Sequence, residues 1–447
     1  MKKAKSRIKY RKQEGITLIA LVVTIVVLLI LAGITINMLF SNGGIFKTAQ
    51  DAANAWNEAT VNEQESLNNL ADQIANLVNG QVGGGQTPGE ETPEVPDGWD
   101  LTKVTPVISK DETPVNVPVP NGFTASTVEE EQKVEEGFVI TDGTNEFVWI
   151  PVNSEQLATM YIEAPGTPLS AYEGVDATTD VYSKLRDAYG SGATQGGAPG
   201  STTNREPDIL TSTGSGDAST DANKGIALIT STFGFSGDNG QVLDQFADML
   251  VADYESSYES IKKYGGFYIG RYEITGSTTS PTVQKGQTVL VSQNWYNLYK
   301  ACNGIVNTAN AKSTMINGTQ WDRVLEWLVE TGMPSEDVYE DSSTWGNYSN
   351  YNTANGYTEG TPGYEEIAGK GVRLAGSSEY WKANNIYDLA GNAYERTQEA
   401  STTYNRVSRG GYYNSPGSGA PASYRFSFDP TSSVSYVSAR PALYVAL

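Results

Sequence analysis

The sequence predicts an α+β head that follows a single N-terminal transmembrane helix and a helical stalk. Three observations lead to this prediction: a charge-free apolar run near the N-terminus, a segment rich in Gly, Pro and acidic residues just before residue 100, and a long remainder with short strand and helix patterns among many Gly, Ser and Asn turns. Short helices around a small sheet, with much irregular structure, are typical of the α+β class.

The N-terminus combines a basic leader with an apolar segment. Residues 1–15 hold seven Lys and Arg and one acid, and residues 16–40 carry no charge. At about 1.5 Å rise per residue, such a helix can cross a hydrocarbon core about 30 Å thick. Because basic flanks stay in the cytoplasm, we expect a single-pass protein of the cell membrane with an extracellular head. The run is longer than the core of a cleaved secretory signal, whereas a plain signal anchor is an open alternative.

Residues 13–21, Gln-Glu-Gly-Ile-Thr-Leu-Ile-Ala-Leu, resemble the prepilin-type cleavage and methylation motif of type IV pilins and pseudopilins. The resemblance implies that a prepilin peptidase cuts between Gly15 and Ile16, and that other pilin subunits are partners in a surface filament. The family usually has Glu at the fifth mature position, where this chain has Ala20. A minor, tip-located or membrane-held subunit is therefore favoured over a shaft subunit.

Two segments are expected between the membrane and the head. Residues 45–78 predict a helical stalk, because apolar side chains recur at three- and four-residue spacing, at Leu67, Leu70, Ile74 and Leu77. This stripe suits packing on the protein's own body and packing in a filament equally well. Residues 79–100 are mainly Gly, Pro and acids and predict a linker. The head is then expected to span residues 101–447.

The pattern of the head mixes strands, helices and one long loop. The turn Asp142-Gly143 separates two predicted strands, 138–140 and 146–152. Residues 190–223 are rich in Gly, Ser, Thr and Ala and predict an exposed loop. Further elements are predicted as an extended segment at 114–120, a strand at 267–274, and helices at 242–263, 292–303 and 318–331.

Composition removes several kinds of chemistry. The chain has no His and one Cys, so there is no Ser-His or Cys-His nucleophile pair, no His-ligated metal and no intrachain disulfide. The formal net charge of −22 argues against a nucleic-acid partner, which needs a basic surface. The sequence therefore points away from the common catalytic and nucleic-acid-binding classes.

Five ordered segments of the head resemble the family of formylglycine-generating enzymes or sulfatase-modifying factors. These segments are residues 267–275, 318–322, 385–395, 406–411 and 439–441. The resemblance implies a C-type-lectin-like fold, which serves both enzymes and pure ligand-binding proteins.

The catalytic residues of that family are absent from this chain. The resemblance places a copper-binding cysteine pair after the Arg409-Gly410-Gly411 segment, where this chain has Tyr412-Tyr413-Asn414-Ser415. The iron-dependent relatives need a histidine cluster, which the chain lacks. We therefore expect no copper and no enzymatic activity, and we interpret Cys302 as a small buried hydrophobe.

The resemblance also implies a calcium site in one turn. Its ligands would be the side chains of Asp388 and Glu395 and the main-chain oxygens of Gly391 and Ala393. All-oxygen ligands with two carboxylates suit this hard cation. The alternative is a carboxylate turn capped by its own amides.

Residues 408–437 form the most informative stretch for function, because they combine Tyr and Phe with many Ser. Tyr gives large amphipathic contacts and Ser adaptable hydrogen bonds, a pairing favoured in binding surfaces. The alternative is that these rings belong to the core. The predicted ligand-binding residues are Tyr412, Tyr413, Asn414, Ser415, Tyr424, Phe426 and Tyr436, with Trp381, Tyr394 and Arg396 added by family analogy.

Together these patterns predict a non-catalytic, surface-displayed, adhesin-like protein that binds a protein or glycan ligand. Two alternatives are a diverged oxidase-family enzyme and a structural pseudopilin of a secretion or pilus system. The Tyr, Ser and Asn enrichment near the C-terminus also resembles the variable region of lectin-like proteins diversified by retroelements.

Overall fold

The computed structural model describes residues 93–160, 221–400 and 406–447. The chain divides into two compact units, Met1–Glu90 and Glu91–Leu447, and every described residue belongs to the second unit, the head. The predicted leader, membrane helix and stalk, the linker up to residue 92 and the loop from 190 to 220 lie outside the described residues. Within the described ranges, no helix is both long and apolar enough to cross a membrane.

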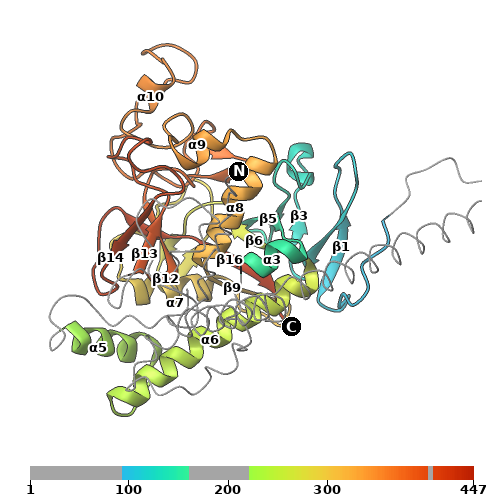
Figure 1. Ribbon diagram of the computed structural model, residues 1–447, viewed down its shortest axis with the longest axis vertical. Helices are drawn as coiled ribbons and strands as arrows, with labels where there is room; N and C mark the ends of the chain where they lie inside the picture. Colours follow the sequence, from blue (N-terminus) through green and yellow to red (C-terminus); the bar gives the residue numbers. More distant parts are fainter. Residues whose placement is uncertain (1–92, 161–220, 401–405) are drawn as a thin grey trace, which may run out of the picture. The chain divides into compact units, whose positions relative to one another are not determined.

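A six-stranded antiparallel sheet forms the centre of the head, in the order β3-β4-β5-β6-β16-β9 (Figure 1). Its strands are β3 (Thr124–Ala125), β4 (Val139–Thr141), β5 (Glu146–Pro151), β6 (Gly266–Gly270), β16 (Pro441–Val445) and β9 (Ala311–Met315).

A four-stranded sheet carries most of the predicted site, in the order β14-β13-β12-β15 (Figure 1). Strands β12 and β15 are parallel, and the other two pairs are antiparallel. The bounds are β12 (Tyr394–Ala400), β13 (Arg406–Arg409), β14 (Arg425–Phe428) and β15 (Val437–Ala439). Only Arg440 separates β15 from β16, so the two sheets meet at this residue.

Three two-stranded sheets complete the described strands. They pair β1 (Val104–Ile108) with β2 (Asn116–Pro120), β7 (Thr275–Ser277) with β8 (Ser280–Thr282), and β10 (Lys382–Ala383) with β11 (Ile386–Tyr387). The described strands form no closed barrel. Small sheets mixed with helices confirm the α+β class.

Helices connect and cover these sheets. They are α3 (Ser154–Met160), α5 (Asp221–Phe233), α6 (Asn239–Tyr264), α7 (Trp295–Ile305), α8 (Gly318–Glu330), α9 (Ser335–Tyr339), α10 (Tyr351–Ala354) and the 3-10 turn η1 (Glu129–Gln132). The longest, α6, begins at a capping box on Asp238 and ends at Gly265, whose φ of 76° is left-handed.

Several predicted elements are confirmed. The strands around Asp142-Gly143 are β4 and β5, and the three predicted helices are α6, α7 and α8, each within three residues of its expected start. Two details differ. The predicted strand at 267–274 ends at Gly270. The Arg271 N–H still donates to Glu146 of β5, but beyond it the backbone bonds to Tyr387 and Ala439 instead. The end of the predicted loop, 221–223, is the start of helix α5.

The core lies on both faces of the six-stranded sheet. Along β5, Val148 and Ile150 join a cluster that includes α6, α7 and α8, whereas Phe147 and Trp149 join a second cluster on the other side. This alternation follows from the two-residue period of a strand. A sheet covered on both faces is rigid, and it holds the four-stranded sheet in place through Arg440 and the β15–β16 connection.

Candidate functional site

The structure brings seven aromatic residues together beside the four-stranded sheet. We call this group the aromatic face, and it consists of Tyr394, Tyr412, Tyr413, Tyr424, Phe426, Phe428 and Tyr436. Tyr394, on β12, is its centre: its ring lies 5.0 Å from Tyr412, 5.7 Å from Phe426 and 5.8 Å from Phe428, between ring centroids. Tyr424 and Tyr436 also contact it, at 6.3 and 6.5 Å.

Strand register explains why Phe426 and Phe428 lie on the same side of the four-stranded sheet. On β14, Phe426 lies opposite Ser408 and Phe428 lies opposite Arg406 of β13. Residues two apart on a strand point to the same face, so Phe426 and Phe428 lie together with centroids 4.8 Å apart. Sequence composition pointed to this stretch, and the alternation Arg-Phe-Ser-Phe was the signal that could have added Phe428 to the predicted residues.

The segment that follows β13 supplies Tyr412 and Tyr413, which form the rim of the aromatic face. Tyr412 stacks on Tyr436 at 4.7 Å and meets Tyr413 edge-on at 5.5 Å. Gly411, with a φ of 73°, makes this rim possible, because a Cβ there would lie 2.2 Å from the Ala420 carbonyl oxygen. The backbone of Gly411 thus packs directly against a neighbouring part of the chain.

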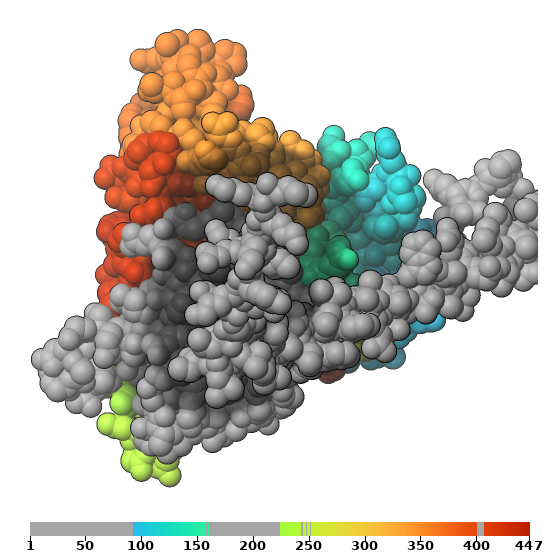
Figure 2. All heavy atoms as spheres, in the orientation of Figure 1, coloured from blue at the N-terminus to red at the C-terminus, as the bar shows by residue number. Residues whose placement is uncertain are grey.

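Tyr394, at the centre of the aromatic face, is more buried than the other six rings. Tyr394 is only 5% exposed, and burial raises the pKa of its hydroxyl. The other six rings are half-buried, so each packs on its neighbours and keeps part of its surface accessible. In the space-filling view the C-terminal part of the head, in red, reaches the visible surface (Figure 2). Chemically, this arrangement offers a fixed apolar surface with hydroxyl groups along it.

Asn414 and Ser415 continue the chain beyond the rim. Asn414 is exposed, and Ser415 is half-buried with its backbone N–H donating to the Tyr412 carbonyl. The Ser415 carbonyl accepts from the N–H of Ser349. These bonds fix the backbone of the segment, so the two polar side chains lie next to the aromatic face.

Arg396 lies against the Phe428 ring of the aromatic face and does not reach the surface. Its side chain is fully buried, 5.6 Å from the Phe428 ring, and donates to the carbonyls of Asp429 and Ser432. Burial, together with the nearby charge of Arg406, lowers the pKa of the Arg396 guanidinium to about 10. The prediction that Arg396 is presented on this face is corrected accordingly, because Arg396 is buried against Phe428.

Trp381 is also placed away from the aromatic face. It is fully buried, and its nearest ring contact is an edge-on approach to Tyr351 at 6.1 Å. Family analogy placed Trp381 on the ligand face, and the structure corrects that placement. The reason is local: the residue precedes the short β10–β11 hairpin, where its carbonyl accepts from the N–H of Asp388.

The predicted calcium turn is a dense network of buried charges. Both oxygens of Glu395 accept from Arg440, at 2.7 and 2.5 Å, and one oxygen of Asp388 accepts from the Gly376 N–H at 2.7 Å. Burial, strengthened by the charge of Glu395, raises the pKa of the Asp388 carboxyl to about 7. Burial also raises the pKa of Glu395 itself.

Sequence reasoning missed a third carboxylate in this network, Glu273, which lies just beyond β6. It accepts from the Asn392 side chain at 2.6 Å and from the Ala393 N–H at 3.2 Å. Burial, with the charges of Asp388 and Glu395, raises its pKa. In the described ranges no group of three or more His, Cys, Asp or Glu is arranged to hold a metal. Calcium at Asp388, Gly391, Ala393 and Glu395 stays a prediction.

Gly391 shows why this turn needs a glycine. Its φ is 76°, and a Cβ there would lie 2.4 Å from the Asn347 carbonyl oxygen. Any other residue here would strain the backbone and collide with Asn347. Its N–H donates to the Gly410 carbonyl at 2.7 Å, which ties the turn to the segment that carries Tyr412.

Cys302 is fully buried in helix α7 within the main core cluster. Burial raises the pKa of its thiol, so the reactive thiolate is disfavoured. The interpretation of Cys302 as a small buried hydrophobe is confirmed.

Comparisons with known proteins give little guidance. No protein-family model matches the chain, and no curated protein matches it. Among solved structures, the chain is similar to Treponema denticola variable protein 1, with 11% sequence identity and a TM-score of 0.21, over 76% of this chain and 92% of that one. A likeness this weak supports no conclusion about fold or function.

Proposed function

We propose that this protein is a non-catalytic ligand-binding protein and that the aromatic face is its binding surface. One observation carries the proposal: six rings that contact one another remain half-buried around the buried Tyr394. Aromatic side chains that belong to a core are normally covered, as Phe147 and Phe267 of the six-stranded sheet are.

The chemistry of these rings suits recognition. Tyr and Phe contribute large contact areas with few rotatable bonds, so little conformational entropy is lost when a ligand covers them. Their neighbours hold them in place before the ligand arrives, which lowers the cost of binding further. A protein or a glycan is the proposed ligand, because aromatic rings pack against apolar side chains and against sugar rings alike.

The amino-acid composition and the position of the buried carboxylates support a non-catalytic role. The chain has no His, and its single Cys is buried in α7. Three carboxylates with raised pKa, those of Glu273, Asp388 and Glu395, lie in the buried network around Arg440, and a fourth, that of Asp253, lies on α6 against Tyr299 and Asn303. A diverged oxidase-family enzyme is therefore the weaker candidate.

The experiment is a binding screen of immobilised glycans and surface proteins with the full-length chain in mild detergent. We expect Tyr412→Ala to weaken binding to any hit at least tenfold, because this ring contacts three others of the face. Tyr380→Ala is the matched control, since Tyr380 is 49% exposed and lies outside the face. Equal loss in both variants, or none in Tyr412→Ala with native circular dichroism, would contradict the proposal.

The sequence supports a wider setting for this function. We propose that the head has a C-type-lectin-like fold and is displayed outside the cell by the apolar segment 16–40, after prepilin-type cleavage between Gly15 and Ile16. The protein then stays membrane-held or joins a pilus as a minor subunit, with other pilin subunits as partners. Intact-mass measurement of the membrane-extracted protein tests this: a mature chain that begins at Ile16 is expected, and one that begins at Met1 rules cleavage out.

A further inference from the structure

Strand β14 is the outermost strand of the four-stranded sheet, and among the described strands it pairs with β13 alone (Figure 1). The other terminal strands of the two larger sheets, β3, β9 and β15, differ from it. β3 has only two residues, backbone groups of residues 306–308 bond along β9, and the Ala439 carbonyl of β15 accepts from the Ile274 N–H. An open strand edge pairs readily with another chain, and natural proteins usually block such edges. The edge of β14 is therefore a place where a partner could bind.

Hydrogen bonds between the other strands of this sheet show which way its backbone groups point. The Tyr394 N–H of β12 donates to the carbonyl just before β15, so it faces β15. Backbone groups of successive residues point to opposite sides of a strand, so those of Glu395 face β13, where its register partner is Arg409. In agreement, the Thr397 hydroxyl donates to the Val407 carbonyl of β13. The backbone groups of Arg409 and Val407 therefore face β12.

The same alternation on β13 fixes the orientation of β14. Because the backbone groups of Arg409 face β12, those of Ser408 face β14, where Ser408 is paired with Phe426. Phe426 therefore bonds to β13, and the N–H and C=O of the next residue, Ser427, point away from the sheet. Ser427 is half-buried, and no described residue bonds to its backbone. An extended chain beside β14 can exchange hydrogen bonds with both groups.

The two rings next to Ser427 add side-chain contacts at this edge. Phe426 and Phe428 lie on the aromatic face with centroids 4.8 Å apart, and both are half-buried. Side chains of a strand added to β14 would lie directly beside them, and β-branched side chains pack well on aromatic rings in such pairs. Backbone bonds then give affinity and side-chain contacts give selectivity. A glycan has no repeating amide groups that could match the edge.

Charge at this edge favours a basic segment. The single cation of β14, Arg425, is buried and paired with Glu399. Asp429, directly after the strand, is half-buried, and the whole chain has a formal net charge of −22. A segment with Lys or Arg at its ends is therefore attracted, whereas an acidic segment is repelled.

We propose that β14 binds an extended, basic segment of a partner protein, which becomes a fifth strand of the four-stranded sheet. The segment bonds to the N–H and C=O of Ser427 and lays β-branched side chains on Phe426 and Phe428. This inference rests on the proposed function, because both rings belong to the aromatic face. It narrows the ligand of that face to a polypeptide and gives the backbone of β14 a part in binding.

The test uses the full-length chain in mild detergent and a fluorescent peptide of the sequence Lys-Thr-Val-Thr-Val-Thr-Val-Lys, with anisotropy as the readout. A second peptide is N-methylated at its six central residues, so it keeps the side chains and loses the N–H groups. We expect the first peptide to bind with a Kd below about 1 mM and the second at least tenfold more weakly. No saturable binding of the first peptide, or equal affinities for the two, would overturn the proposal.

Two variants of one residue locate the binding. Ser427→Pro removes the outward N–H, and proline is tolerated on edge strands where that group would point to solvent, so circular dichroism should stay native. We expect it to bind the peptide at least tenfold more weakly than the natural chain. Ser427→Ala keeps the N–H and should bind as the natural chain does. Equal affinities of the two variants would show that the edge of β14 is not the site.

Hydrogen exchange followed by mass spectrometry needs no variant. Saturating peptide should slow amide exchange in residues 424–429 and leave β1 (Val104–Ile108) unchanged. Absence of this protection would overturn the proposal. The two hypotheses about the aromatic face remain separable: if Tyr412→Ala weakens binding to a hit of the ligand screen but the peptide does not bind, the proposed function stands and the added strand is wrong.

Discussion

The two larger sheets of the head use aromatic residues in opposite ways. In the six-stranded sheet, Phe147, Phe267 and Tyr268 are fully buried, because clusters of apolar side chains cover both faces. Beside the four-stranded sheet, the rings of the aromatic face contact one another and stay half-buried, with Tyr394 as the exception. The comparison teaches that the residue type alone does not decide whether an aromatic side chain belongs to the core. What decides it is whether a second layer of side chains covers the ring.

The largest expected effect concerns Arg440, where the two sheets meet. It pairs with Glu395 of β12 and also donates to the carbonyls of Gly270 and Tyr387, at 2.9 Å each. We expect Arg440→Met to lower the free energy of unfolding by roughly 4 to 5 kcal/mol, because it leaves a buried carboxylate without its partner. Urea unfolding followed by circular dichroism measures this.

A double variant separates charge from packing at this junction. Arg440→Met with Glu395→Gln removes both charges, and we expect it to recover at least about 1 kcal/mol relative to Arg440→Met alone. A double variant no more stable than the single one would mean that the ion pair is unimportant and that the two sheets are held together by packing.

The next prediction compares the cost of a Phe→Ala substitution in the six-stranded sheet with its cost in the four-stranded sheet. Phe147→Ala, on β5, should cost about 3 to 4 kcal/mol, because it creates a cavity in a covered core. Phe426→Ala, on β14, should cost only about 1 kcal/mol, because the ring is already half in solvent. Denaturant unfolding of both proteins gives the two values. Similar costs would show that the aromatic face belongs to the core and would weaken its proposed role in binding.

The smallest expected effect is a pH dependence of stability that arises from helix α6, which packs on the six-stranded sheet. Burial raises the pKa of Asp253 on α6 above its usual 3.8, although Tyr299 and Asn303 donate to it. The native state then holds a proton that the unfolded chain has lost, so stability falls as pH rises from about 4 through the native pKa. Asp253→Asn should reduce this fall, as measured by thermal unfolding at several pH values. The exposed Asp97→Asn is the control, and an unchanged slope in Asp253→Asn would contradict the expectation.

Much of the fold was predictable because its signals are local. Helix α6 has a regular apolar stripe and a Gly265 stop, and the β4–β5 hairpin has its Asp-Gly turn. Helix α5 was not predicted, because Gly225 and several Ser and Thr residues weaken its helical pattern and packing on α6 and α7 supplies the stability. The end of β6 at Gly270 depends on partners distant in the sequence, which periodicity does not reveal.

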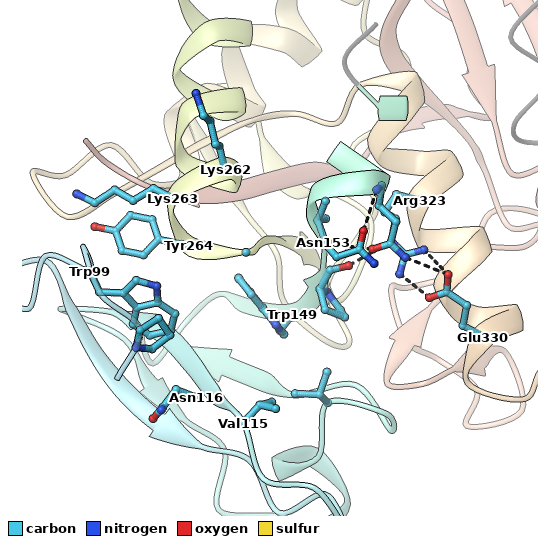
Figure 3. Close-up of a pocket in the computed structure, with 16 residues that line it drawn as sticks. Trp99, Val115, Asn116, Trp149, Asn153, Lys262, Lys263, Tyr264, Arg323 and Glu330 are labelled. Carbon is cyan, nitrogen blue, oxygen red and sulfur yellow. Dashed lines mark hydrogen bonds and ion pairs between the residues drawn. The ribbon is translucent and has the colours of Figure 1, made fainter. Parts of the chain in front are cut away.

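The candidate site was predictable only in part, for a related reason. The Tyr and Phe residues of 408–437 form one stretch of sequence, so composition alone pointed to them. The roles of Arg396 and Trp381 depend on burial, which the chain acquires only when folded. A cavity of about 590 Å³ in the head (Figure 3) was not predicted either, because its wall combines residues from Pro96 to Glu330 that no motif connects.

The position of β16 has a consequence for the order of folding. This strand, Pro441–Val445, pairs with β6 on one side and β9 on the other, so the six-stranded sheet is divided until residues near 445 have been synthesised. Pairings between strands so far apart in sequence are slow to form, because a long loop must close first. The central sheet of this head can therefore be completed only at the end of synthesis, after all other described strands have left the ribosome.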